Sequence, residues 1–160
     1  MKVSGLILEG SYIQRNNYGN AKSLINVLTI GAELDGLVRI TRIAESYYFD
    51  KIGAFQIPTQ TLVLAGMNHY QFTGDNGIPP ASIGANDINP EISNSAAISS
   101  VTNAISVFVS QTLNIGLQKS EQDTIEECIT STETLLDPIV EAFKLEGKNL
   151  FISFSLIRLF

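Results

Sequence analysis

The sequence has 160 residues, 44% of them hydrophobic and 16% charged, a composition that indicates a folded globular chain rather than a disordered one. Its formal net charge of −6 at pH 7 argues against nonspecific binding to nucleic acid or to an anionic membrane. The only cysteine, Cys128, cannot form an internal disulfide, and no cysteine pair suggests a metal site, so a reducing, cytoplasmic setting is the default expectation.

The apolar run Val3–Glu9 predicts the first β-strand. Buried parallel strands need neighbouring strands and helices on both faces, so a strand this close to the first methionine leads us to expect further sequence upstream in the same domain. Ser11 follows the strand but does not fit the G-x-S-x-G nucleophile motif, because Gly10 is adjacent to it and a polar run follows instead of a helix. We therefore expect that Ser11 is not a nucleophile.

A second buried strand is predicted at Val27–Gly31, and it is followed by a loop that carries Asp35. Asp35 stands directly before Gly36, and this pair of residues suits a tight turn. The carboxylate is therefore expected just beyond the carboxyl end of the strand, either as a structural turn residue or as part of a functional site.

A helix is predicted over Arg39–Phe49, because apolar residues recur there at spacings of three and four. These residues share one face of the helix: Ile40, Ile43, Ala44, Tyr47 and Tyr48. Arg39 and Arg42 can bind an anionic substrate group. A solvated helix face with an ion pair between Arg42 and Glu45 is the interpretation that we prefer.

A third buried strand is predicted at Leu62–Ala65, and it is followed by His69, the only histidine of the chain. A lone histidine in a loop is commonly a surface or structural residue. Asp35 and His69, however, leave the ends of two successive strands, where open α/β sheets carry their chemistry. We therefore expect the two side chains to meet, with the carboxylate fixing the imidazole tautomer and stabilising the imidazolium during catalysis.

Residues 74–90 are rich in Gly, Pro, Asn and Asp and predict a long loop beside His69, which can wall a substrate pocket. Within the loop, Pro80–Gly84 imitates the nucleophile motif, but it lacks the first glycine and follows no strand, so we reject it. Asp75 and Asp87 can be considered with His69 as metal ligands, yet their spacing matches no recognised metal site. We therefore predict no metal and no cofactor.

The next predicted helix can be capped by Ser93 or Ser95, extends to about Leu113 and ends before Gly116. Its apolar residues repeat at spacings of three and four, so one face should pack on the sheet: Ile98, Val101, Ile105 and Phe108.

The last helix is predicted to begin at Ser120, with Asp123 completing a weak capping box. Cys128 lies on its apolar face and is assigned to packing. Pro138 should kink or restart this helix, because proline lacks the backbone N–H and clashes with the preceding turn. The second part then continues to Gly147, where we place the end of the domain, residues 1–147.

Residues 148–160 form an apolar tail of a different character, with Arg158 as the only charged residue from Asn149 onward. The tail is shorter than the ~20 residues that span a bilayer. Three interpretations stay open: a buried strand, a membrane-surface anchor, and a segment that comes from a wrong reading frame or a retained intron.

The order strand–GAELDG–helix followed by strand–GMNHYQF resembles the C-terminal half of an α/β-hydrolase. In that family the triad runs Ser, Asp or Glu, then His along the chain. Asp35 matches the acid and His69 the histidine, and the resemblance extends from about Val3 to about Gly147. The chain departs from the family at Ala32, where related acid loops often carry glycine, and in having no nucleophile motif before Asp35.

This resemblance implies a partial α/β-hydrolase fold, a mainly parallel sheet with flanking helices. It also implies hydrolysis of carboxylic esters or related acyl bonds, with a small-molecule ester or acyl substrate and with a serine from a part of the domain that this chain lacks. The chain alone is then expected to be inactive. The alternative is a noncatalytic pseudo-enzyme or fragment that binds a partner supplying the missing strands, or that self-associates. A G-x-S-x-G motif encoded upstream would favour the first hypothesis.

Overall fold

Three parallel strands form an open sheet in the computed structural model, which describes residues 3–14, 25–53, 58–75 and 78–157, the last twelve of these by their backbone only. The strands lie side by side in chain order: β1 (Gly5–Glu9), β2 (Asn26–Ala32) and β3 (Thr59–Leu64). Gly5 stands opposite Asn26, and Val27 stands opposite Thr59. The three predicted strands are thus confirmed, with small shifts at their ends, and so is the α/β class with a parallel sheet.

The sheet has an apolar core on each face because its strands are apolar at successive positions. One core contains Leu28, Ile30 and Leu62 together with Val107 and Phe108 of α3 (Asn94–Thr112). Leu28, Ile30 and Leu62 are fully buried. Each such side chain contributes roughly 1.5–3 kcal/mol relative to an exposed one.

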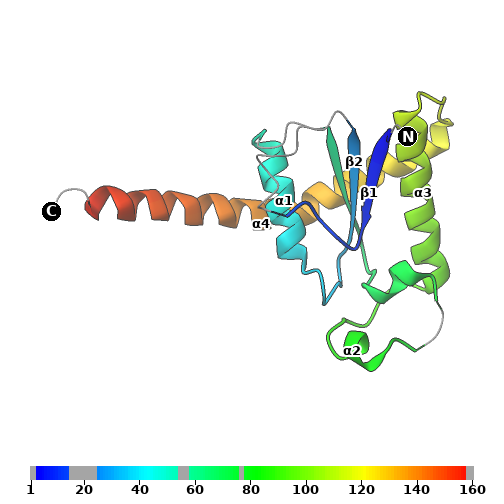
Figure 1. The fold of residues 1–160 in the computed structure, drawn as a ribbon, viewed down its shortest axis with the longest axis horizontal. Coiled ribbons are helices and arrows are strands. Elements are labelled where there is room, and N and C mark those ends of the chain that lie inside the picture. The colour runs from blue at the N-terminus through cyan, green and yellow to red at the C-terminus, as the bar shows by residue number, and fades with distance from the viewer. Residues whose placement is uncertain (1–2, 15–24, 54–57, 76–77, 158–160) are drawn as a thin grey trace.

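The second core lies on the opposite face of the sheet, under α1 (Ile40–Lys51) and the middle of α4 (Lys119–Ile157). It contains Val63 of β3, Ile43 of α1 and Leu136 of α4. Figure 1 shows this layering, with α3 on one side of the sheet and α1 on the other.

The outer edge of β3 is covered by α4. The hydroxyl of Thr132, a side chain that is 1% exposed, accepts a hydrogen bond of 2.8 Å from the backbone N–H of Val63. The same hydroxyl donates to the carbonyl of Cys128 at 2.8 Å. An edge strand presents unpaired backbone groups, and here one of them finds its partner on a helix. Helix α3 contacts β1 (Figure 1). Among the described residues, however, no helix side chain hydrogen-bonds to the backbone of β1 as Thr132 does to that of β3.

The sequence predicted Ser93 or Ser95 as the cap of α3, and the structure shows that it is Ser93. Its hydroxyl accepts a hydrogen bond of 3.2 Å from the N–H of Ala96. The predicted start of the last helix is wrong by about one residue, and its capping box by two. Helix α4 begins at Lys119, and Glu121 accepts the N–H of Gln118 at 2.8 Å, so Gln118 and Glu121 take the places expected for Ser120 and Asp123.

Pro138 lies inside α4 and does not end it, which corrects the predicted restart at this residue. A proline in a helix costs about 3 kcal/mol. Leu136 and Val140, on either side of it, are 0% and 6% exposed and pack against α1 and β3. At roughly 1.5–3 kcal/mol each, these two contacts offset the cost of the proline.

The backbone of residues 149–157 continues α4, so the buried-strand interpretation of the tail is wrong for these residues. The C-terminal part of α4 extends away from the sheet and its covering helices (Figure 1). Over the described part of the chain, no helix has the length and apolarity that a membrane crossing requires.

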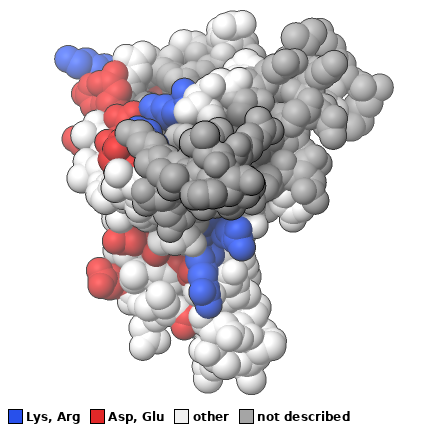
Figure 2. All heavy atoms as spheres, turned by 90° about the vertical axis from the view of Figure 1, so that its left-hand side faces the viewer, with Lys and Arg blue, Asp and Glu red and all other residues white. Residues whose placement is uncertain are grey.

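Basic side chains of α1 and α4 lie next to acidic ones. Arg42 contacts Glu45 at 3.2 Å, the ion pair that the sequence predicted, and Lys51 of α1 contacts Glu133 of α4 at 3.1 Å. Figure 2 shows the two signs of charge interspersed on the side toward which α4 extends. Because its charge is paired within α1, Arg42 fits the solvated-face interpretation better than an anion site.

Candidate functional site

Asp35 and His69 meet at the carboxyl ends of β2 and β3. Nδ1 of His69 lies 2.8 Å from Oδ2 of Asp35, so the prediction that the two side chains meet is confirmed. The Asp35 side chain is 1% exposed and the imidazole is 27% exposed. The pair therefore has a buried acid end and a solvent-facing histidine end.

Asp35 is oriented by the turn that follows β2. Its Oδ1 accepts the backbone N–H groups of Leu37 at 2.8 Å and of Val38 at 2.6 Å, which leaves Oδ2 for the imidazole. This is the local hydrogen bonding that makes Asp a turn residue, so the structural interpretation of Asp35 is confirmed. The turn role leaves Oδ2 available for a functional one. An ionised carboxylate only accepts hydrogen bonds, so Nδ1 carries the proton, and Nε2 of the neutral ring keeps its lone pair.

The end of β1 also contacts the imidazole. Gly10 has φ +54°, and a Cβ at this position would lie 3.1 Å from Cε1 of His69. The ring of Phe72 stands edge-on to the imidazole, with 6.2 Å between the ring centroids. All three strand ends thus contact the ring, while Nε2 has no hydrogen-bond partner among the described residues.

The acid loop and the histidine loop are joined by hydrogen bonds. The N–H of Leu34 donates to the carbonyl of Met67 at 2.9 Å. The N–H of Gly66 donates to the carboxylate of Glu33 at 2.9 Å, and Gly66 has φ +67°, a conformation that favours glycine. These bonds hold the two loops in one geometry, so the short Asp35–His69 distance does not depend on the two side chains alone.

Asp87 accepts backbone hydrogen bonds from both loops, a role that the sequence did not predict. Its Oδ1 accepts the N–H of Gly36 at 3.0 Å and of His69 at 3.2 Å, and its Oδ2 accepts the N–H of Tyr70 at 2.9 Å. The carboxylate is thus engaged with backbone donors. Asp75 accepts the phenol of Tyr70 at 3.0 Å, a hydrogen bond that raises the pKa of Tyr70.

The metal hypothesis for Asp75, Asp87 and His69 gains no support from their placement. Across the residues with described side chains, no three His, Cys, Asp or Glu residues gather in a way that could hold a metal ion.

Asn68 and Gln71 flank the histidine and bind the long loop. The backbone N–H of Asn68 donates to the side-chain oxygen of Gln71 at 3.2 Å, and the backbone N–H of Gln71 donates to the side-chain oxygen of Asn68 at 3.2 Å. The amide of Asn68 donates to the carbonyl of Ile88 at 2.8 Å, and that of Gln71 donates to the carbonyl of Ile92 at 2.9 Å. Buried amides need such partners, and here the partners fasten the loop to the histidine segment.

The two serines weighed as nucleophiles do not join the pair. Ser11 is half-buried directly after Gly10, and no hydrogen bond connects it with His69 in the described part of the chain. The motif-like segment around Ser82 forms α2 (Ala81–Gly84), a single turn in which Ser82 is exposed.

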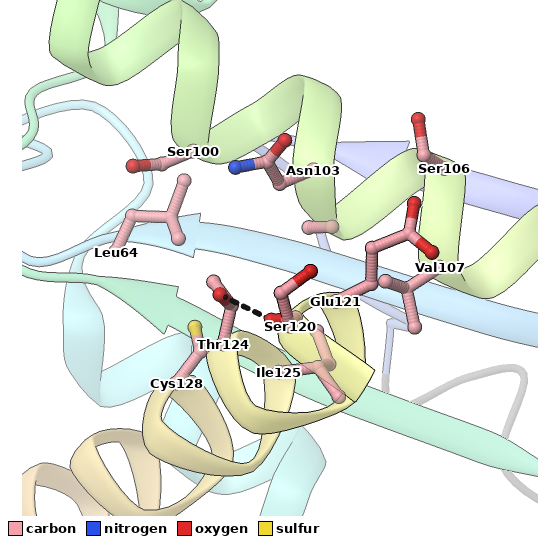
Figure 3. A pocket seen from close by; sticks show the side chains of 11 residues that line it. Leu64, Ser100, Asn103, Ser106, Val107, Ser120, Glu121, Thr124, Ile125 and Cys128 are labelled. Atoms are coloured by element: carbon pink, nitrogen blue, oxygen red, sulfur yellow. Dashed lines mark hydrogen bonds between the residues drawn. The ribbon is translucent and has the colours of Figure 1, made fainter. Parts of the chain in front are cut away.

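A cavity of about 340 Å³ lies between α3 and α4 (Figure 3). Neither Asp35 nor His69 lines it. Ala104, Val107 and Ile125 form apolar walls, and Asn103 and Ser120 lie at its polar rim.

Cys128 lines the same cavity and is half-buried, so its predicted packing role accounts for only part of its surroundings. Burial raises the pKa of its thiol, and the hydrogen bond with Thr132 opposes this shift. A thiol with a raised pKa is a poor nucleophile.

Comparison with protein-family models, with curated proteins and with solved structures gives no match for this chain. The site and the fold together define a class of protein, namely an α/β chain with a carboxylate–imidazole pair at the carboxyl edge of a parallel sheet. The function must be argued from that geometry.

Proposed function

We propose that this chain supplies the acid and the histidine of a serine-dependent α/β-hydrolase that acts on carboxylic esters or related acyl bonds. The observation that carries the proposal is the 2.8 Å contact between Asp35 and Nδ1 of His69, whose imidazole is 27% exposed and whose Nε2 has no hydrogen-bond partner among the described residues. The order acid then histidine along the chain, each after its own strand, supports the same assignment.

In this function His69 acts as the general base and then as the general acid. Nε2 accepts the proton of a serine hydroxyl while the serine oxygen attacks the acyl carbon. The imidazolium then returns the proton to the departing alkoxide, and a water molecule repeats the cycle to release the acid. Asp35 holds the ring with its Nδ1–H directed inward and stabilises the positive charge that forms on the imidazolium.

The nucleophile in this proposal comes from outside the described residues. A serine that reaches Nε2 must enter on the open side of the imidazole, because the other sides are occupied by Asp35, Gly10 and Phe72. The oxyanion-hole donors would come from the same additional part of the domain.

A partner-binding role without catalysis is the second candidate. It is favoured by the outer edge of β1, with which no strand pairs among the described residues. Leu6 of β1 is 43% exposed and Val3, two residues before the strand, is 52% exposed, although β1 lies in a parallel sheet. A groove of about 140 Å³ runs between β1 and Phe108 of α3. An unpaired strand edge with apolar neighbours is a surface to which another strand can add.

The experiment starts from the nucleotide sequence upstream of the segment that encodes this chain. If it encodes a strand followed by G-x-S-x-G and a helix, the longer protein should hydrolyse p-nitrophenyl butyrate and be labelled by a fluorophosphonate. His69→Ala should lower kcat/KM by about 10³-fold or more, and Asp35→Asn by a similar order. The chain alone should hydrolyse the ester no faster than its own His69→Ala variant.

Two outcomes would contradict this proposal. Hydrolysis by the longer protein that persists in His69→Ala would remove the pair from the mechanism. Turnover by the chain alone that disappears in Ser11→Ala would make Ser11 the nucleophile. If no nucleophile motif lies upstream and a partner strand binds β1, the second candidate replaces the first.

A further inference from the structure

We propose that Asp87 is a positioning residue, which holds the Asp35–His69 contact without touching the imidazole ring or Asp35 itself. Its meaning for catalysis rests on the function proposed above, whereas its effect on the geometry of the pair does not. Residues 86–91 are then a support of the site rather than a wall of a substrate pocket.

The contacts of Asp87 connect the two residues of the pair through their backbone. Gly36, the residue after Asp35, donates its N–H to Oδ1 at 3.0 Å. His69 donates its own N–H to the same oxygen at 3.2 Å. Tyr70 donates to Oδ2 at 2.9 Å. One carboxylate thereby sets the distance between the acid turn and the histidine backbone.

A carboxylate fits this position for a chemical reason. Gly36, His69 and Tyr70 all present donors, and an ionised carboxylate has two oxygens that only accept. An asparagine has one such oxygen, and its NH₂ group would face a backbone donor. Hydrogen bonds to a charged acceptor are also stronger than those between neutral groups.

The segment that carries Asp87 is itself held against both loops. A Cβ at Gly36 would overlap the carbonyl oxygen of Asn86, so the two backbones lie in direct contact. The carbonyl of Ile88 accepts from Asn68 at 2.8 Å, and the N–H of Glu91 donates to the carbonyl of Gly66 at 2.8 Å. Asp87 therefore has fixed neighbours on either side, and its carboxylate is presented in one orientation.

The experiment uses the single histidine of the chain, which makes the imidazole signals unambiguous. Proton NMR of the full chain, at a concentration where sedimentation shows one species, should give a downfield resonance from the Nδ1 proton held by Asp35. In Asp87→Ala we expect this proton to exchange with water about tenfold faster or more, because loss of the charged acceptor loosens both loops. Asp87→Asn should lie between wild type and Asp87→Ala.

Two variants serve as controls. Asp35→Asn, which removes the charged acceptor of the ring, should lose the protected resonance. Asp75→Asn should keep it, because Asp75 lies in the same long segment but bonds to the phenol of Tyr70 and to neither backbone donor of the pair. The amide spectrum reports for each variant whether the fold is retained.

An unchanged resonance and exchange rate in both Asp87→Ala and Asp87→Asn would overturn the proposal. If Asp87→Ala does not fold, the decision rests on Asp87→Asn, which keeps the shape of the side chain. In a protein with esterase activity, Asp87→Asn should lower kcat with little change in KM, since Asp87 does not touch the substrate. If the resonance depends on Asp87 but a longer protein that carries the nucleophile motif has no esterase activity, the proposed function is refuted and the positioning role stays intact.

Discussion

Gly10 is the residue that brings the end of β1 against the imidazole, and it predicts a mutational effect specific to the site. Alanine at φ +54° pays the cost of a left-handed backbone, and its Cβ would lie 3.1 Å from Cε1 of His69 and from the ring of Phe72. We expect Gly10→Ala to lower the free energy of unfolding in urea and to slow the carbethoxylation of His69 by diethyl pyrocarbonate.

Gly53→Ala is the matched control for this change. Gly53 has φ +71°, and no described atom lies within 4 Å of the position of its Cβ. Gly53→Ala should lower the free energy of unfolding only by the cost of placing alanine in a left-handed backbone conformation, about 1–2 kcal/mol. Gly10→Ala should lower the free energy of unfolding by about 1–3 kcal/mol more than this, because its methyl group is also crowded against the rings of His69 and Phe72. Equal costs and unchanged reactivity of His69 would mean that Gly10 does not confine the ring.

The individual residues differ in how far the sequence could predict them. Asp35 and His69 were predictable because both come within a few residues of the end of an apolar run, and the position after a strand is a local property. Asp87 was not, because its partners lie 51, 18 and 17 residues away and offer backbone N–H groups, which every sequence has. Asp87 could be noticed in the sequence only as a loop aspartate.

At the scale of the elements, the contact between α4 and β3 yields a prediction about stability. Thr132→Val keeps the shape of the side chain but leaves the buried N–H of Val63 without its acceptor. We expect the free energy of unfolding in urea to fall by about 1–3 kcal/mol. In Thr132→Ser the free energy of unfolding should fall less, because serine retains the hydroxyl.

Thr130→Val provides the control for this helix. Thr130 is exposed, and its hydroxyl donates only to the carbonyl of Glu126 one turn earlier. This substitution should change stability by no more than about 0.5 kcal/mol. A comparable loss in Thr130→Val and Thr132→Val would place the effect in the helix itself and not in its bond to the strand.

The same helix shows where element prediction failed. The three strands follow from apolar runs, and α1 and α3 from spacings of three and four, because both signals are local. The rule that proline ends a helix is also local, but the continuity of α4 through Pro138 comes from Leu136 and Val140, which are buried on both sides of it. Packing with distant elements decided this case.

For the molecule as a whole, the two edges of the sheet are unequal. The edge of β3 is covered by α4 through Thr132, whereas Leu6 of β1 and Val3, just before it, are exposed. Parallel sheets are normally covered on both faces and continue to further strands, so β1 is the place where another chain can add. The net charge of −6 opposes association only weakly, because salt screens it over ~8–10 Å.

We therefore expect the chain to self-associate through β1 as its concentration rises from micromolar to millimolar. Leu6→Lys should shift sedimentation velocity profiles toward the monomer, because a lysine on an edge strand discourages pairing with a second strand. Ile78→Lys makes the same change of charge at a side chain that is 94% exposed in the long loop, and it should leave the profiles unchanged. A wild-type chain that stays monomeric throughout this range, with a sharp cooperative melt, would show that the edge of β1 needs no partner, and it would count against both the docking of a nucleophile-bearing strand there and the partner-binding alternative.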